Sequence, residues 1–267
     1  DPVAVGDTDR DVVQEHLRGR VVTVDLDAPV SPQTIADLEG VAAALAAFHG
    51  LTVSGGRVRP LERELQRFVS RSTGIRSVDE SAGTALLELA HRLLRLPRPD
   101  RSSSLVHGDC KPGQFLLHGS RVALLDLDHC GLADPAYDVG NLVASLRQQA
   151  VQQSQQAVQQ SQQAIQQSRQ ATQQSQQAVA PARDRLDRAL ELGSVVVDAY
   201  GRAMAAAGPG PAGSEGTRFE ERVEAFVAVS LMRKALRAFA RSPQSSTPLR
   251  LVAEAHRGLD HSGGEHS

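Results

Sequence analysis

The chain has 267 residues, 40% of them hydrophobic, and a formal net charge of -2. A chain of this size and composition can bury one sizeable core, which predicts a globular domain of enzyme size or a two-lobed one. The charge supplies no general attraction to nucleic acid or to anionic membranes, so we expect neither as a partner.

The cysteines and the apolar runs restrict the cellular setting. Cys110 and Cys130 can pair only once and neither belongs to a CxxC motif, which argues against a disulfide framework and against a zinc site. No apolar run approaches the roughly 20 residues that cross a bilayer. These features predict a cytoplasmic protein without a membrane partner.

The N-terminal part contains one strand pattern. Val22, Val24 and Leu26 fall on one face of residues 20–26, which is the period-2 signature of a β-strand. The chain begins at Asp1 and not at a methionine, so we expect it to be a fragment of a longer gene product.

Three helices are predicted to follow. Ser31 is a suitable N-cap, Pro32 suits the first helical position, and apolar residues recur at helical spacing until Gly50. The two further helices predicted are 61–72 and 80–96.

A tight β-hairpin is predicted next, with strands 115–117 and 121–125 around a turn at 118–120. Antiparallel pairing sets Gln114 within a residue or two of Asp126, across about 5 Å. An amide oxygen and a carboxylate are therefore expected to converge at this end of the hairpin.

Two more carboxylates belong to the same end of the predicted hairpin. Asp109 precedes the first strand and Asp128 follows the second. We therefore expect three carboxylates, including Asp126, and the Gln114 amide to crowd together. Hard oxygen ligands of this kind suit Mg²⁺.

Helical patterns resume near Asp138 and continue, with interruptions, to about residue 257, with an apolar face that includes Phe219, Phe226 and Leu231. The chain is therefore predicted to be α+β but mostly helical. The predicted divisions are 1–30, 31–147, 148–182, 183–260 and a disordered tail at 261–267.

Residues 148–182 form a low-complexity segment in which a Gln- and Ala-rich heptad recurs five times. Val151 and its equivalents alternate with serines, which predicts only a weak coiled-coil seam, and Arg169 is the only charge between Gln148 and Val179. The favoured interpretation is an expanded, exposed insertion without chemistry. The alternative is a helical arm that mediates self-association.

Residues 107–114 read His-Gly-Asp-Cys-Lys-Pro-Gly-Gln. This segment resembles the catalytic loop of aminoglycoside phosphotransferases and choline kinase-like enzymes, which are relatives of the protein-kinase fold. Residues 125–128 and 133–142 resemble the motifs that follow that loop in the family, in the same order. The resemblance implies the C-terminal lobe of such a fold, with a catalytic β-hairpin.

The resemblance also implies roles for five residues. Asp109 would accept the proton of a substrate hydroxyl, and Lys111 would neutralise charge on the transferring phosphoryl group. Gln114 and Asp126 would hold Mg²⁺ against the phosphates of ATP or GTP. Asp128 would assist the metal or the acceptor.

Three neighbouring residues are predicted to be structural. His107 would brace the loop by hydrogen bonding, Asp138 would act as an N-cap at a helix start, and Cys110 would be a small packed residue.

The chain departs from the family pattern in two ways. The family usually has asparagine where this chain has Gln114, and some sugar kinases of this fold resemble the chain in using glutamine, which hints at a sugar-like acceptor. The family also places a five-stranded nucleotide lobe before the hinge. Here the roughly 26 preceding residues contain no lysine, so residues 1–30 are interpreted as a remnant whose hinge strand is Val21–Leu26.

The leading hypothesis is a Mg²⁺-dependent kinase that phosphorylates a hydroxyl of an aminoglycoside- or sugar-like molecule. One alternative is a catalytically deficient or truncated kinase-fold protein with an associating Gln-rich arm. A metal hydrolase that uses His107 is a weaker alternative. Glu215, Glu220 and Glu221 are compatible with a polycationic acceptor and equally with a solvated helix start.

Overall fold

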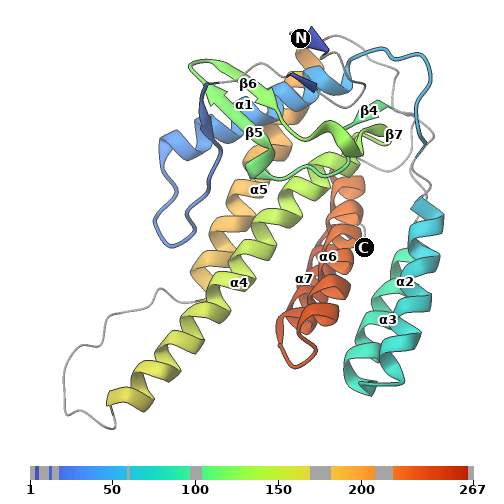
Figure 1. The fold of residues 1–267 in the computed structure, drawn as a ribbon, viewed down its shortest axis with the longest axis vertical. Helices are drawn as coiled ribbons and strands as arrows, with labels where there is room; N and C mark the ends of the chain where they lie inside the picture. Colours follow the sequence, from blue (N-terminus) through green and yellow to red (C-terminus); the bar gives the residue numbers. More distant parts are fainter. Residues whose placement is uncertain are drawn as a thin grey trace.

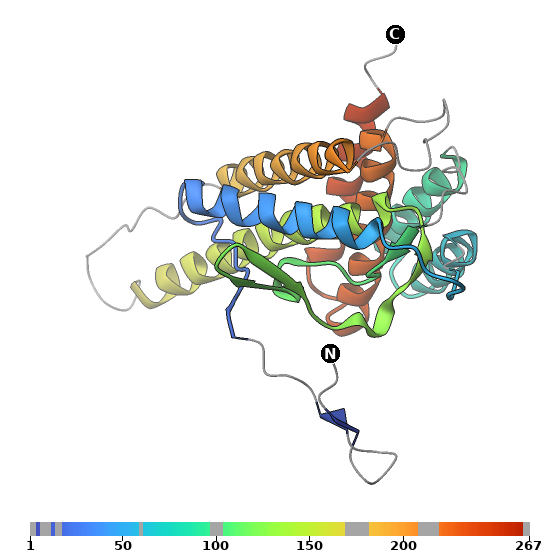
Figure 2. The ribbon, with the colours of Figure 1, turned by 90° about the horizontal axis from the view of Figure 1, so that it is seen from above.

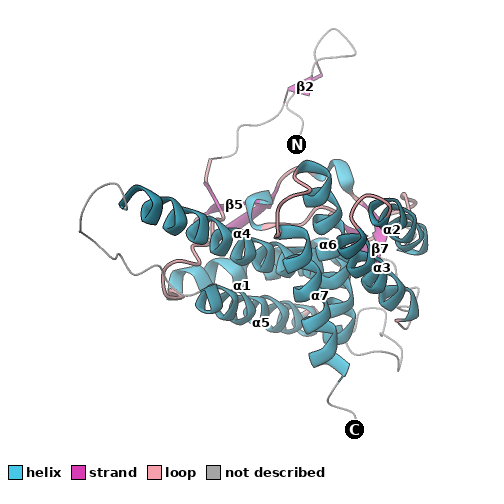
Figure 3. Ribbon diagram, turned by 90° about the horizontal axis from the view of Figure 1, so that it is seen from below, coloured by secondary structure: helices cyan, strands magenta, loops and turns pink. Residues whose placement is uncertain are grey.

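The computed structural model describes residues 4–5, 12–13, 18–58, 61–96, 104–168, 182–207 and 219–263. The fold is α+β and mostly helical, as predicted, with a few short strands gathered at one end of a helical body (Figures 1 and 3). Within the described ranges, no helix is long and apolar enough to cross a bilayer.

The helices that the structure describes agree with the sequence pattern in number and order up to residue 96. They are α1 (Pro32–His49), α2 (Leu61–Arg76), α3 (Glu80–Arg95), α4 (Ala136–Ser168), α5 (Ala182–Ala206), α6 (Phe219–Arg241) and α7 (Thr247–Gly263). Helix α7 includes residues 261–263, which the sequence had assigned to a disordered tail. Residues 264–267 lie outside the described residues.

The strands form three small antiparallel sheets. The first is β3-β5-β6, from Arg20–Val21, Phe115–His118 and Arg121–Leu124. The second pairs β4 (Ser104–Val106) with β7 (Gly131–Ala133), and the third pairs β1 (Ala4–Val5) with β2 (Val12–Val13). Two 3-10 turns, η1 (Pro112–Gln114) and η2 (Leu127–His129), flank the hairpin.

The predicted strand over residues 20–26 is shorter than expected. Only Arg20–Val21 is a strand, and it pairs with β5 of the β5–β6 hairpin, so the expectation of a nucleotide-lobe strand over Val21–Leu26 is wrong for this segment. The alternation itself is confirmed, because Val22, Val24 and Leu26 are buried while the residues between them are exposed. The side chains of residues 22–26 therefore alternate as in a strand, but the ladder with β5 ends at Val21, so these residues are not a β-strand.

Helix α1 begins and ends as predicted. The Ser31 side chain accepts a hydrogen bond from the backbone N–H of Thr34, Pro32 opens the helix, and Gly50 follows its last residue. The helix packs against α5 and against β6 of the hairpin. Seen from above, it lies between them (Figure 2), so it links the hairpin to the helical body.

Helices α4 and α6 approach closely at Gly140. A Cβ atom at this position would lie 2.6 Å from the Cβ of Phe226 and 2.9 Å from the backbone nitrogen of Val227. We expect Gly140→Ala to lower the free energy of unfolding by about 1–3 kcal/mol through overpacking, measured by denaturant titration. Gly201→Ala on α5 is the control, because its Cβ would meet open space. Gly140→Ala with unchanged stability would contradict this close approach.

Helix α4 continues from Ala136 into the Gln-rich repeat without a break at residue 147. Ala150, Val151, Ser154 and Ala157 are buried, and the Gln149 side chain donates a hydrogen bond of 2.6 Å to the carbonyl of Val24. The interpretation of an exposed insertion is therefore wrong for these first turns. Residues 169–181 of the repeat lie outside the described residues.

The first two heptads differ in environment although their sequences agree. Val151 is 8% exposed and Val158 is 45% exposed. We expect Val151→Ala to destabilise the fold by about 1–2 kcal/mol through lost apolar burial. Val158→Ala is the matched control and should change thermal stability little, because alanine favours the helix. Equal effects of the two substitutions would refute the packing of the first heptad.

Candidate active site

The loop between β4 and η1 is anchored by one buried carboxylate of α4. Asp138 accepts hydrogen bonds from the backbone N–H groups of His107 (2.5 Å) and Gly108 (2.8 Å). Gly108 has φ +84°, a conformation that side-chain-bearing residues rarely adopt. The start of the loop is therefore fixed to the first turn of α4.

The same carboxylate binds a histidine that the sequence analysis did not assign. His49 Nε2 lies 3.0 Å from Asp138 Oδ2, and its Nδ1 lies 2.8 Å from the hydroxyl of Tyr200. The His49 and Asp138 side chains are fully buried, and burial raises the pKa of Tyr200, with the charge of Asp138 adding to the effect. This network joins the loop that begins at His107 to α1, α4 and α5.

Asp138 is structural, as expected, but it anchors the loop and does not cap the start of α4. Asp138 is the third residue of α4, and the helix start is capped instead by Asp134, whose Oδ1 accepts the Ala136 N–H at 2.9 Å. Asp134 also pairs with Arg222 at 2.9 Å. The N-cap explanation for Asp138 is therefore wrong.

His107 is buried and lies between the loop and the hairpin. Its Nε2 is 2.7 Å from the carbonyl oxygen of Leu125, and its Nδ1 accepts the backbone N–H of Asp109 at 3.3 Å. Both ring nitrogens therefore have protein partners. This arrangement argues against the hydrolase alternative, which needs His107 free to bind a metal or a substrate.

Asp109 and Lys111 reach the surface of the loop together. The Lys111 ammonium donates a hydrogen bond of 2.7 Å to Asp109 Oδ2. The Lys111 side chain is 45% exposed and the Asp109 side chain is 38% exposed. Partial burial alone would raise the pKa of Asp109, but the hydrogen bond and charge of Lys111, with weaker contributions from His129 and Lys234, lower it. Asp109 is therefore ionised and accessible.

The hairpin register is as predicted. Phe115 pairs with Leu124, and the Leu125 N–H donates to the carbonyl of Gln114 at 2.8 Å. The Gln114 side-chain nitrogen donates to Asp126 Oδ2 at 2.8 Å. Among the described residues Asp126 is the one non-glycine with positive φ (61°), and strained backbone of this kind concentrates at functional sites.

The predicted convergence of three carboxylates is not found. Asp109 pairs with Lys111, whereas Asp126 contacts Gln114, and Asp128 is exposed in η2. Over the described ranges, no three His, Cys, Asp or Glu side chains come close enough to hold one metal ion. The structure thus joins Gln114 to Asp126 by a direct hydrogen bond. Asp128 lies within the η2 turn and not on the strand register that aligns Gln114 with Asp126.

Cys110 is buried, as predicted. Burial raises the pKa of its thiol well above the ordinary value, and the charges of Asp138 and Asp109 add to this. A thiol in this state is a poor nucleophile, so Cys110 packs the loop.

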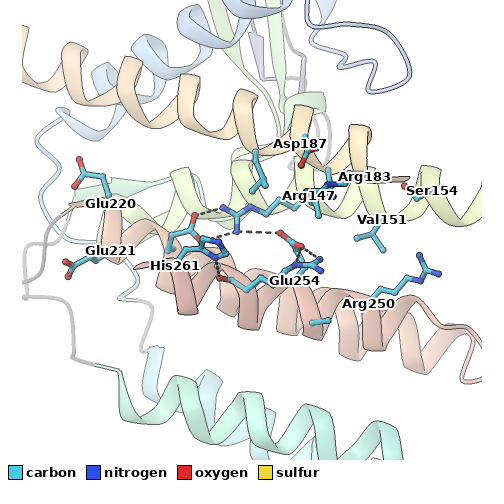
Figure 4. A pocket seen from close by; sticks show the side chains of 17 residues that line it. Arg147, Val151, Ser154, Arg183, Asp187, Glu220, Glu221, Arg250, Glu254 and His261 are labelled. Atoms are coloured by element: carbon cyan, nitrogen blue, oxygen red, sulfur yellow. Dashed lines mark hydrogen bonds and ion pairs between the residues drawn. The ribbon is translucent and has the colours of Figure 1, made fainter. Parts of the chain in front are cut away.

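A separate pocket of about 1020 Å³ lies between α4, α5, α6 and α7. Figure 4 shows charged side chains of both signs around it. Arg147 pairs with Glu224 and lies 4.0 Å from Glu254, which in turn pairs with Arg257. Glu220 and Glu221, which the sequence offered for a polycationic acceptor, line it, whereas none of the residues predicted for catalysis or metal binding does so among the described residues. Through Arg147, these ion pairs connect α4 to α6 and α7.

The phosphotransferase enzyme family (APH) matches residues 12–174. The match includes the loop of residues 107–114, the hairpin and most of α4, and it extends over more than half of the chain. The chain therefore belongs to this phosphotransferase family.

Solved structures share the fold at low sequence identity. A choline/ethanolamine kinase family protein from Mesorhizobium loti is 13% identical, with a TM-score of 0.53 over 97% of this chain and 74% of that one. Choline kinase from Cryptosporidium parvum Iowa II is 12% identical, with a TM-score of 0.54 over 98% and 71%.

An amicoumacin kinase is 14% identical, with a TM-score of 0.52 over 91% of this chain and 63% of that one. The chain thus spans less than two thirds of that kinase. None of the curated proteins matches the chain.

Proposed function

We propose that the protein is a Mg²⁺-dependent phosphotransferase that moves the γ-phosphate of ATP or GTP to a hydroxyl of a small molecule. The observation that carries this proposal is the pairing of an accessible, ionised Asp109 with Lys111, beside a hairpin end at which Gln114 meets Asp126. Family membership supports the reaction class. A cytoplasmic location and a sugar- or aminoglycoside-like acceptor belong to the same proposal.

Asp109 and Lys111 have different roles in transfer of the phosphoryl group. Asp109 is the base that receives the acceptor hydroxyl proton as the oxygen attacks phosphorus, because its carboxylate is ionised and reaches solvent. Lys111 is positioned to stabilise negative charge on the phosphoryl group, since its ammonium already lies 2.7 Å from Asp109. His107 and Asp138 hold both residues in place through the loop backbone.

The donor set at the hairpin end fits Mg²⁺. This ion is commonly bound by one or two carboxylates together with substrate phosphates and water. Asp126 supplies one carboxylate, and the Gln114 amide oxygen would supply a second ligand, while its nitrogen holds Asp126. Bound there, Mg²⁺ would neutralise the nucleotide phosphates. Asp128 would act through water or on the acceptor. The amicoumacin kinase, whose structure contains AMP-PNP and Ca²⁺, supports a nucleotide with a divalent cation.

The test is to identify the compound that receives the γ-phosphate of the nucleotide. The protein is incubated with ATP or GTP, Mg²⁺ and a panel of sugars and aminoglycosides, and ³¹P NMR follows the γ-phosphorus. A new phosphomonoester resonance on an acceptor is expected. Release of inorganic phosphate alone, with every acceptor, would overturn the proposal.

A second candidate is a catalytically deficient kinase-fold protein that associates through its Gln-rich helix. It is favoured by the exposure of Val158 on α4. Self-association through residues 148–182 would give a concentration-dependent mass in analytical ultracentrifugation, which Val158→Asp should abolish. A constant monomer mass would count against the arm.

A further inference from the structure

A chain of hydrogen bonds leads from Tyr200 of α5 to the backbone of the loop that begins at His107. The Tyr200 hydroxyl lies 2.8 Å from His49 Nδ1, and His49 Nε2 lies 3.0 Å from Asp138 Oδ2. The same carboxylate accepts the backbone N–H groups of His107 and Gly108. Helix α5 packs against both α1 and α4 (Figure 2), so three helices meet at this chain of hydrogen bonds.

The order of donors and acceptors follows from the chemistry of these groups. An ionised carboxylate only accepts, so the His49 nitrogen that faces Asp138 carries a proton. The side chains of His49 and Asp138 have no exposed area, and burial favours the neutral imidazole. In the neutral ring with a proton on Nε2, the other nitrogen accepts a hydrogen bond. That nitrogen faces Tyr200, whose pKa is raised by burial and by the charge of Asp138, so the hydroxyl keeps its proton and donates.

The ring of Tyr200 is held independently of its hydroxyl. The ring makes an edge contact with His49, with centroids 5.6 Å apart, and stacks on Phe219 of α6 with centroids 5.1 Å apart. The whole residue is 2% exposed. Phenylalanine at position 200 would therefore keep these ring contacts and lose only the hydroxyl, which separates the hydrogen bond from the packing.

We propose that Tyr200 and His49 are positioning residues for phosphoryl transfer. The Tyr200 hydroxyl donates to His49 Nδ1 and thereby keeps the proton of His49 on Nε2. This N–H holds the Asp138 carboxylate in the orientation that receives the loop N–H groups, and the loop carries Asp109. A network in which every group has a defined partner specifies one arrangement of its members, and a catalytic group acts only in the right geometry. The inference rests on the proposed function, since it takes Asp109 as the base.

The first test is the protonation state of His49, measured from the ring nitrogen signals of the full chain labelled with ¹⁵N-histidine. The wild-type ring should show a protonated Nε2 and an unprotonated Nδ1 that accepts a hydrogen bond. The Nδ1 signal should move in Tyr200→Phe, because its donor is lost. The disappearance of signals in His49→Gln identifies them. Tyr137→Phe is the matched control, since it removes another buried hydroxyl, which is bound by Arg233, and should leave the His49 signals in place.

The second test is whether the Tyr200 hydroxyl acts on the loop. Loss of one buried hydrogen bond should raise the hydrogen-exchange rates of the His107 and Gly108 amides about three- to tenfold in Tyr200→Phe. With an acceptor from the panel, kcat should fall by a similar factor. The KM for the nucleotide should stay unchanged, because no member of this network is assigned to the nucleotide.

Glutamine at position 49 distinguishes positioning from general stabilisation. Its side-chain nitrogen takes the place of His49 Nε2 and donates to Asp138 without any need for a particular tautomer. We expect His49→Gln to keep most of the amide protection. Adding Tyr200→Phe to His49→Gln should change neither the exchange rates nor kcat further, so the two substitutions should be coupled in a double-mutant cycle.

Three results would overturn the inference. They are a wild-type His49 ring with a proton on Nδ1, exchange rates or kcat unchanged in Tyr200→Phe, and an equal effect of Tyr200→Phe with histidine or glutamine at position 49. If Tyr200→Phe does not fold, the wild-type ring signals and the amide exchange of His49→Gln decide. Failure of the proposed function is a separate outcome, because no acceptor would then be phosphorylated while the ring signals and the exchange rates still responded to Tyr200→Phe.

Discussion

Replacing Asp109 with asparagine should lower the rate of phosphoryl transfer by about 10²- to 10⁴-fold, the range found for a lost general base. Asparagine has nearly the same shape but cannot take the acceptor proton, and Lys111 loses the carboxylate that now lies 2.7 Å away. The loop anchor at Asp138 is untouched, so thermal stability should change little. The measurement is kcat under saturating nucleotide, together with a thermal melt.

The control for this substitution is Asp198→Asn, because Asp198 is an exposed residue of α5 and should leave the rate unchanged. Lys111 also shapes the pH profile. Since the pKa of Asp109 is lowered, the base stays ionised at lower pH than an ordinary aspartate would, and the rate should fall only when acidification reaches that lowered pKa. Undiminished transfer by Asp109→Asn would remove Asp109 as the base.

Asp138→Ala should be the most destabilising single change in the site, at about 3–5 kcal/mol of unfolding free energy. The carboxylate is buried and accepts two backbone N–H groups of the loop while it binds His49. Its removal leaves these groups unsatisfied in a dry environment. Urea or guanidinium titration measures the loss, and activity should fall with it because the loop is released.

Asp198→Ala is again the matched control, since it removes an aspartate from the exposed face of a helix. A loss below about 1 kcal/mol in Asp138→Ala, equal to that of the control, would show that the loop is held by something other than this carboxylate.

The local parts of the site could be predicted from sequence. The register that brings Gln114 to Asp126 depends on a short turn and on strand alternation, which are written in fewer than 15 consecutive residues. The burial of His107 and Cys110 follows from their place beside the same loop. Such features need no knowledge of distant segments.

The contacts between distant segments could not be predicted. His49 is 89 residues from Asp138 and 151 from Tyr200, and no periodicity links these positions. The pairing of β4 with β7 could not be predicted either, because a strand of three residues is too short to show an alternating pattern.

The repeat shows a further limit of sequence patterns. Val151 and Val158 have the same neighbours in consecutive heptads, yet one is buried and the other is exposed. Identical local sequence cannot distinguish them, because their burial depends on how far α4 runs alongside α5 and α7. Helix propensity was therefore a sound guide to the structure of residues 148–168 but not to their packing.

The central claim, that this chain holds a working metal and phosphate site, is tested most directly by calorimetric titration of ATP with and without Mg²⁺. We expect nucleotide binding that depends on Mg²⁺, that is lost in Asp126→Ala, and that is retained in Asp109→Asn, because Asp126 is assigned to the metal and Asp109 is not. Binding that ignores Mg²⁺, or that survives Asp126→Ala unchanged, would contradict the account.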